Sequence, residues 1–162
     1  SAAEGSWFAF VRAHGDLSDT ETRAFAVHEE WFRMLETTGV NKSYKLVVLR
    51  VMLDQESLFR GVDLTDFAVA CRRFMQNHTV LRRDLEGDGH AIDHSGAPDE
   101  EWTKWWNRWP VDRWLDPPKG RKWFIREGNS FRLNFFCEHQ LLPAIESLTE
   151  EIVDWRLAAY SR

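Results

Sequence analysis

Four tryptophans at helical spacing constrain the fold of this chain more than any other feature. They stand at positions i, i+3, i+4 and i+7, which places all four on one face of an α-helix: Trp102, Trp105, Trp106 and Trp109. An aromatic stripe of this kind usually packs into a core. Because the same helix carries Arg108, a second interpretation stays open, in which one or two indoles line a surface pocket beside positive charge.

Capping residues and apolar periodicity predict further helices. Ser18 and Glu21 form a capping box that opens a helix ending near Thr37, before Gly39. Ser43 is expected to cap a buried helix over the apolar run 46–53. Further helices are expected at 7–14, at about 64–75, around Arg82 and Arg83, at 102–109 with Pro110 as its stop, and at about 143–160.

A turn at 127–130 between two short apolar and basic runs predicts a β-hairpin over 122–133. We therefore expect a mainly α fold with a small β-hairpin (α+β), similar to a winged helix-turn-helix whose wing is the hairpin. The expected organisation is a single domain over 1–162, with an N-terminal helical extension at 1–40 and a helical core at 41–162.

Charge is segregated along the chain. The 162 residues include 21 Lys and Arg against 26 Asp and Glu, a net charge of −5 that argues against a uniformly basic nucleic-acid binder. Residues 104–132, however, carry eight basic and three acidic side chains, and residues 41–86 carry eight and six. Six of the nine tryptophans fall within residues 102–123, so the aromatic and basic groups coincide.

Cysteine content and apolar patterning indicate a cytoplasmic location. Cys71 and Cys137 are too few for a disulfide scaffold, which favours a reducing compartment. No apolar run reaches the length of a membrane span, and the N-terminus has no signal-peptide pattern, so we expect no membrane partner. The chain begins at Ser1 without an initiator Met, and we expect it to be part of a larger protein.

Motifs for catalysis are missing from the sequence. His90, Asp93 and His94 offer two imidazoles and a carboxylate for a metal, or else belong to a solvated acidic loop. The sequence has no matching Cys or His cluster, no glycine-rich phosphate loop and no nucleophile elbow. We expect no metal, no cofactor and a noncatalytic domain.

Two sets of residues are candidates for binding DNA phosphates. At the start of the buried helix, backbone N–H groups, a hydroxyl and two ammonium groups would cradle a phosphate, in the segment Lys42, Ser43, Tyr44 and Lys45. The alternative there is a serine cap with the tyrosine in the core. Arg82 and Arg83 would extend this positive surface, or merely end a helix.

The second set lies in the most basic segment and comprises Arg108, Arg113, Lys119, Arg121, Lys122 and Arg126. Cations beside flat apolar rings suit a nucleic acid, whose phosphates and bases they contact respectively. Ordinary solvated strand charges are the alternative for the hairpin.

Four motifs resemble a known accessory domain: 41–50, 62–67, 122–124 and 153–160. Together, over about residues 40–160, they resemble a domain appended to superfamily-2 helicases and nucleases of bacterial defence and restriction systems. A more distant similarity is to the sulfur-binding domains of phosphorothioate-dependent HNH endonucleases. That resemblance implies an apolar pocket for the backbone sulfur. This chain lacks the prolines expected around the lysine, and an apolar wall of Trp105, Trp106, Trp109 and Pro110 takes their place in our interpretation.

We therefore expect a DNA-binding recognition module that recruits an attached helicase or nuclease to double-stranded DNA, which is either unmodified or carries a modification such as a phosphorothioate or a methyl group. The alternative is a protein-interaction or structural accessory domain of a defence helicase, in which the tryptophan face packs on a neighbouring domain.

Overall fold

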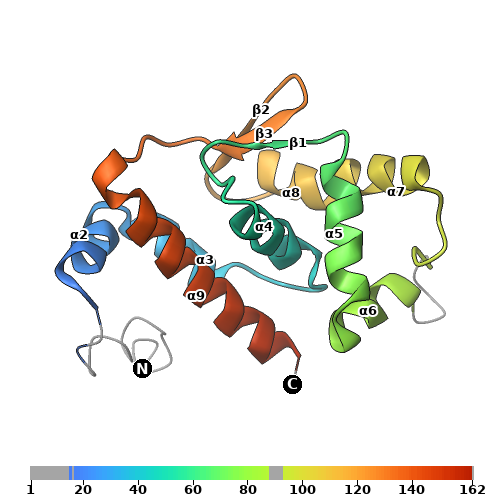
Figure 1. Ribbon diagram of the computed structural model, residues 1–162, viewed down its shortest axis with the longest axis horizontal. Coiled ribbons are helices and arrows are strands. Elements are labelled where there is room, and N and C mark those ends of the chain that lie inside the picture. Colours follow the sequence, from blue (N-terminus) through green and yellow to red (C-terminus); the bar gives the residue numbers. More distant parts are fainter. Residues whose placement is uncertain (1–14, 16, 88–92, 162) are drawn as a thin grey trace. The chain divides into compact units, whose positions relative to one another are not determined.

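The computed structural model describes residues 15, 17–87 and 93–161, which form two compact units (Figure 1). The first comprises the described residues up to Gly39 and Phe136–Ala159; the second comprises Val40–Phe135 with Tyr160 and Ser161. The protein is mainly helical with a small antiparallel sheet, which confirms the predicted α+β class. The helix expected at 7–14 lies outside the described residues.

The first unit contains α2 (Asp19–Val27), α3 (Glu29–Thr37), the 3₁₀ turn η2 (His139–Leu141) and α9 (Leu142–Tyr160). The capping box between Ser18 and Glu21 is present. One continuous helix to Thr37 was predicted, and this is wrong, because the backbone leaves helical geometry at His28. The break brings Phe25 and Phe32 into contact, with ring centroids 5.9 Å apart, so both rings are buried.

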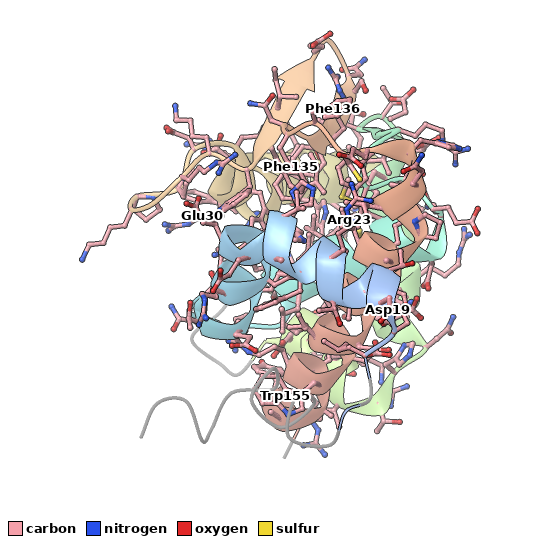
Figure 2. The ribbon with its side chains drawn as sticks, turned by 90° about the vertical axis from the view of Figure 1, so that its left-hand side faces the viewer. Asp19, Arg23, Glu30, Phe135, Phe136 and Trp155 are labelled. Atoms are coloured by element: carbon pink, nitrogen blue, oxygen red, sulfur yellow. The ribbon has the colours of Figure 1, made fainter. Side chains whose placement is uncertain are left out.

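Two long-range interactions hold α9 to α3 within this unit. The buried indole of Trp31 donates to the Thr149 hydroxyl at 3.1 Å. The Arg156 guanidinium donates to the carbonyls at the C-terminal end of α3, those of Leu35, Glu36 and Thr38. These carbonyls have no partner within the helix, so a cation there satisfies them. Figure 2 shows this side of the chain, with Asp19 and Arg23 along α2 and Trp155 on α9.

The helices of the second unit are α4 (Tyr44–Asp54), α5 (Phe67–Gln76), α6 (Thr79–Glu86) and α7 (Asp99–Trp106), followed by the π-helical turn η1 (Asn107–Val111) and α8 (Asp112–Leu115). The predicted helices over 46–53 and around 82–83 are confirmed. Seven consecutive or near-consecutive apolar residues of α4 are buried, which explains why its pattern shows no polar face.

Pro110 does not stop the tryptophan helix, contrary to our prediction. It lies inside the π-helical turn, and the helical path continues through α8 to Leu115. Proline lacks the N–H that an α-helix would use at this position, and the wider turn accommodates it. The consequence is that Trp114 belongs to the same continuous helical segment as the four-tryptophan stripe.

The sheet has three antiparallel strands in the order β1-β3-β2. The predicted hairpin is confirmed as β2 (Phe124–Glu127) and β3 (Ser130–Leu133). The third strand, β1 (Val62–Asp63), was not predicted; it pairs with β3 through Val62 opposite Phe131. Two residues give too short a pattern to identify a strand from sequence.

Gly61, just before β1, is the glycine on which the sheet depends most. Its φ is +94°, and an added Cβ would lie 2.9 Å from the Ser130 hydroxyl and 3.2 Å from the Phe131 carbonyl oxygen. Gly120 has a similar φ of +89° but open space around it. An alanine at Gly120 would suffer only the strain of a left-handed backbone, whereas an alanine at Gly61 would suffer that strain and a steric clash as well.

We predict that Gly61→Ala destabilises the fold by about 3 kcal/mol, whereas Gly120→Ala costs about 1 to 2 kcal/mol, the strain of a left-handed residue alone. Urea unfolding followed by tryptophan fluorescence measures both. Equal losses in the two variants would show that β1 does not approach β3 as closely as described.

Candidate nucleic-acid interface

The basic segment, residues 108–126, runs from the π-helical turn through α8 into β2. It contains six basic and two acidic side chains. All six cations are exposed to solvent: Arg108, Arg113, Lys119, Arg121, Lys122 and Arg126. In Figure 1, the hairpin follows α8 in this part of the second unit, and α8 packs against β2. The segment thus presents a concentration of positive charge on a helix end and an adjoining strand.

Buried tryptophans lie beneath this segment and position its backbone. Trp114 is buried, and its indole N–H donates to the Lys45 carbonyl at 3.0 Å, which ties α8 to α4. The Lys45 ammonium lies 4.6 Å from the centre of the same ring. Trp123, also buried, is covered by the Arg121 guanidinium at 4.1 Å. Cations held over indole faces are partly ordered before any ligand binds.

Carboxylates contact this part of the chain at its edges. Lys122 lies 3.3 Å from Asp116, with both side chains mostly exposed. In the hairpin, Arg132 pairs with Glu127 at 2.7 Å. Arg126 donates instead to the turn, at the Gly128 carbonyl. Exposed pairs of this kind contribute little to stability, so a polyanion can displace them at small cost.

The predicted phosphate cradle at 42–45 already holds a carboxylate. Ser43 is fully buried, and both its N–H and its hydroxyl donate to Asp84 Oδ2, at 2.9 and 2.6 Å. The sequence predicted that the Ser43 side chain caps α4, and this is wrong, because the hydroxyl donates to Asp84 instead. The Lys42 ammonium is 4.0 Å from Asp84 Oδ1.

Two tyrosines complete the Asp84 cluster. The Tyr160 hydroxyl donates to the Asp84 carboxylate at 2.7 Å, and the Tyr44 hydroxyl donates to the Asp84 carbonyl. Burial, reinforced by the Asp84 charge, raises the pKa of Tyr44 to about 12, and burial together with the bond to Asp84 raises the pKa of Tyr160. Both phenols stay protonated and remain donors. Asp84 and Tyr160 were not among the predicted site residues, because no local pattern links residues so distant in the chain.

Arg82 and Arg83 are exposed on α6, and Arg82 lies 3.5 Å from Glu86 one turn along the helix. Figure 1 shows α6 at the end of this unit that is opposite to the hairpin. The structure therefore brings α6 together with the start of α4, through Asp84, and separately brings Lys45 together with α8.

The four residues assigned to an apolar wall have different environments. Trp106 and Pro110 are buried. Trp105 is half-buried and packs against Tyr44 and His94, with ring centroids 5.1 and 4.0 Å away. Trp109 is 46% exposed and lies beneath the Arg108 guanidinium, 5.3 Å from its ring centre.

A buried arginine fixes α7 and the loop before it. Arg72 of α5 donates to the Ala97 carbonyl at 2.7 Å and to Asp99 Oδ1 at 2.5 Å, and it lies over the Trp102 ring. Asp99 begins α7, where a negative charge also complements the helix dipole. His94 closes this packing, with its ring 5.5 Å from Trp102.

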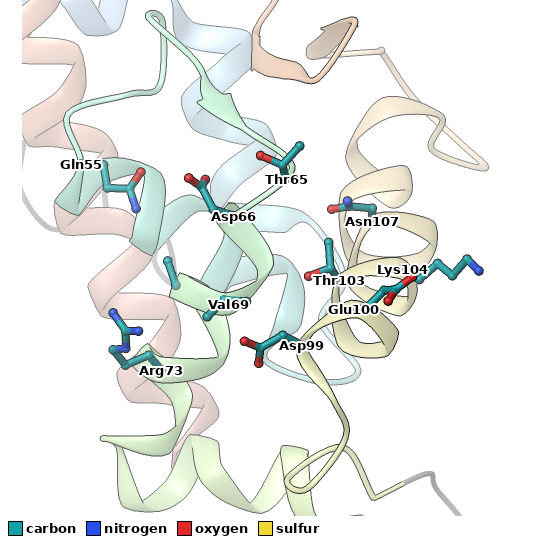
Figure 3. Close-up of a pocket in the computed structure, with 11 residues that line it drawn as sticks. Gln55, Thr65, Asp66, Val69, Arg73, Asp99, Glu100, Thr103, Lys104 and Asn107 are labelled. Carbon is teal, nitrogen blue, oxygen red and sulfur yellow. The ribbon is translucent and has the colours of Figure 1, made fainter.

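A groove of about 890 Å³ lies between α5 and α7 (Figure 3). Acidic, basic, amide and hydroxyl side chains line it together, among them Asp66, Arg73 and Lys104. Asn107 donates to the Leu64 carbonyl at 3.1 Å, while its buried Oδ1 accepts no hydrogen bond within the described residues. Because the lining of this groove carries charges of both signs, it favours neither anionic nor cationic ligands.

His90 lies outside the described residues, so the candidate metal ligands at 90–94 are described only in part. Within residues 15, 17–87 and 93–161, no group of three His, Cys, Asp or Glu side chains is placed to hold a metal ion. Over the same ranges, none of the helices has the length and apolarity needed to cross a membrane.

Comparisons with known proteins give no relative: no protein-family model, no curated protein and no solved structure matches this chain.

We predict that Asp84→Ala destabilises the protein by about 3 kcal/mol or more, because it leaves the buried Ser43 donors and the Tyr160 hydroxyl without an acceptor. Tyr160→Phe, which removes one donor and keeps the carboxylate bound, should cost about 1 kcal/mol. Thermal and urea unfolding of both variants test this. Similar losses of unfolding free energy in the two variants would show that the Asp84 carboxylate is not the shared acceptor of the cluster.

Burial lowers the pKa of His94, so the unfolded chain binds a proton at this side chain at higher pH than the folded chain does. Its contribution to stability is complete above the ordinary histidine pKa of about 6.5 and is lost as the pH falls below that value. We predict that His94→Phe, which keeps a flat ring, reduces the loss of unfolding free energy between neutral and mildly acidic pH. An unchanged pH dependence in urea unfolding would contradict this.

Proposed function

We propose that the second unit binds double-stranded DNA through the basic segment, as a noncatalytic module that recruits an attached helicase or nuclease. The observation that carries the proposal is the exposure of all six cations between residues 108 and 126, against two acidic side chains. Phosphate contacts from arginine and lysine supply most of the affinity of a nonspecific DNA binder. The whole chain carries a net charge of −5, so this attraction is confined to the part of the chain where the cations are concentrated.

The order of elements supports a winged helix-turn-helix-like version of this proposal. A helix (α4) precedes a short strand (β1), further helices follow, and a hairpin (β2 and β3) ends the series, with β3 between β1 and β2. In folds of this type the hairpin is the wing, and the helix before it faces the DNA. Here that helix is η1–α8, which carries Arg108 and Arg113.

Sulfur readout is the more specific version of the proposal, and it requires an apolar pocket beside a cation. Because Trp106 and Pro110 are buried, the exposed part of the predicted wall is mainly Trp109 beside Arg108. One exposed ring is a surface rather than a pocket. We therefore propose binding to the phosphate backbone and use matched phosphorothioate and ordinary duplexes to test for a preference.

A protein-interaction domain is the second candidate, and exposed apolar residues of the first unit favour it. Phe136 is 84% exposed and Val27 is 55% exposed. Contiguous exposed apolar patches are typical of surfaces that contact another protein, and Phe136 and Val27 are the candidates for such a patch in the first unit. In this case the basic segment would only be solvated, and the chain would not bind DNA.

We predict that duplex affinity falls steeply as the salt concentration rises. The double variant Arg121→Ala, Lys122→Ala should lower the slope of log Kd against log salt by about 1 to 2, because each lost phosphate contact lowers that slope by about 0.9. Fluorescence anisotropy across a salt series measures the slope. Arg33→Ala is the matched control, since it removes an exposed arginine that pairs with Glu29 in the first unit.

Binding that is absent at low salt, or a slope unchanged by the double variant, would contradict the proposal. Melting temperatures of the variants should stay close to that of the unmodified protein, since exposed charges contribute little to folding. Equal affinity for phosphorothioate and ordinary duplexes would exclude sulfur readout and leave backbone binding intact.

A further inference from the structure

Trp109 is the large apolar side chain of the second unit that the described structure leaves most exposed, at 46%. Among the described residues, the other two large apolar side chains that are exposed, Val27 and Phe136, belong to the first unit. Its neighbours in the stripe behave differently, since Trp102 and Trp106 are completely buried. The core of this unit therefore does not depend on Trp109, and its exposure needs another explanation.

The backbone around Trp109 follows from the π-helical turn at 107–111. Pro110 and Val111 are buried, so the chain on one side of Trp109 is anchored in the core. Asn107, on the other side, is held by its bond to the Leu64 carbonyl. A flat ring is thus presented to solvent from a fixed backbone, and π-helical turns are frequent at functional sites.

Positive charge borders the ring. The Arg108 guanidinium lies 5.3 Å from the ring centre. Arg113 is exposed four residues further along the same helical path, a spacing that makes it a neighbour of Trp109 on the helix surface. An exposed indole with cations beside it has the two elements of a site for single-stranded nucleic acid, a platform for a base and contacts for its phosphates.

We propose that Trp109 is a stacking site for an unpaired nucleobase, so that the protein binds most tightly where duplex DNA continues into a single strand. This inference rests on the proposed function and narrows its substrate class to DNA ends and junctions with unpaired bases. The base edges of a continuous duplex are reached through its grooves, and the faces of its internal base pairs are covered by stacked neighbours, whereas an unpaired base in a single strand can offer its face to an aromatic ring. The basic segment binds the adjoining duplex through its phosphates.

The test compares three DNA molecules: a blunt duplex, the same duplex with a single-stranded overhang, and the same overhang with abasic sugars. The abasic overhang keeps the phosphates and lacks the bases. Affinities by fluorescence anisotropy are measured for the unmodified full chain, for Trp109→Ala and for Trp109→Phe, with melting temperatures to confirm folding. Trp109→Phe keeps a flat ring and serves as the conservative control.

We expect the overhang with bases to bind about 5- to 100-fold more tightly than the other two, the effect of one stacked base. Trp109→Ala should remove this preference and leave blunt-duplex affinity unchanged, and Trp109→Phe should retain much of it. Equal binding of all three DNA molecules by the unmodified protein would overturn the inference while leaving the proposed function in place. A folded Trp109→Ala variant that loses affinity for all three equally would also overturn it, and failure to bind any DNA would overturn both proposals.

Discussion

The second unit depends on buried indoles that donate to backbone carbonyls of neighbouring helices. The Trp102 N–H binds the Ala68 carbonyl at 2.6 Å, which attaches α7 to α5, and the Trp114 N–H binds the Lys45 carbonyl, which attaches α8 to α4. A buried N–H without an acceptor is costly, so each bond fixes the rotation of its helix as well as its position. The segment 99–115 is held at both ends by the same kind of contact.

This anchoring determines which side chains of the segment reach solvent. With Trp102, Trp106 and Trp114 facing the core, Arg108 and Trp109 face outward. The exposed cations and the exposed ring are therefore a consequence of the internal packing. In our account the same packing produces both proposed contacts, because phosphates are contacted by the cations and an unpaired base is contacted by the ring.

The features that sequence predicted are local ones. The capping box at Ser18 and Glu21, the buried helix α4 and the hairpin each depend on residues a few positions apart, and all are present. The helix break at His28 and the π-helical turn at Pro110 were missed, because histidine gives no local signal for a break and proline usually signals the end of a helix. The tryptophan stripe was likewise ambiguous, since spacing gives a common face and tertiary packing decides how much of each ring it covers.

In the candidate site, too, local features could be predicted from sequence and long-range contacts could not. Exposed cations concentrated between 108 and 126 were identifiable from charge alone. The carboxylate that occupies the start of α4 was not, because Asp84 lies 41 residues from Ser43 and only the fold brings them together. A helix start that is open to phosphate and one that holds an internal carboxylate have the same local sequence pattern.

Amide hydrogen exchange of the full chain with and without a short DNA duplex tests the central claim most directly, because it locates the contact on the chain. Our account predicts that DNA slows exchange within residues 108–126 and leaves the start of α4 and α6 unchanged, since the Ser43 N–H is already bonded to Asp84. Protection confined to residues 42–45 and 82–83, or protection nowhere in the second unit, would contradict it.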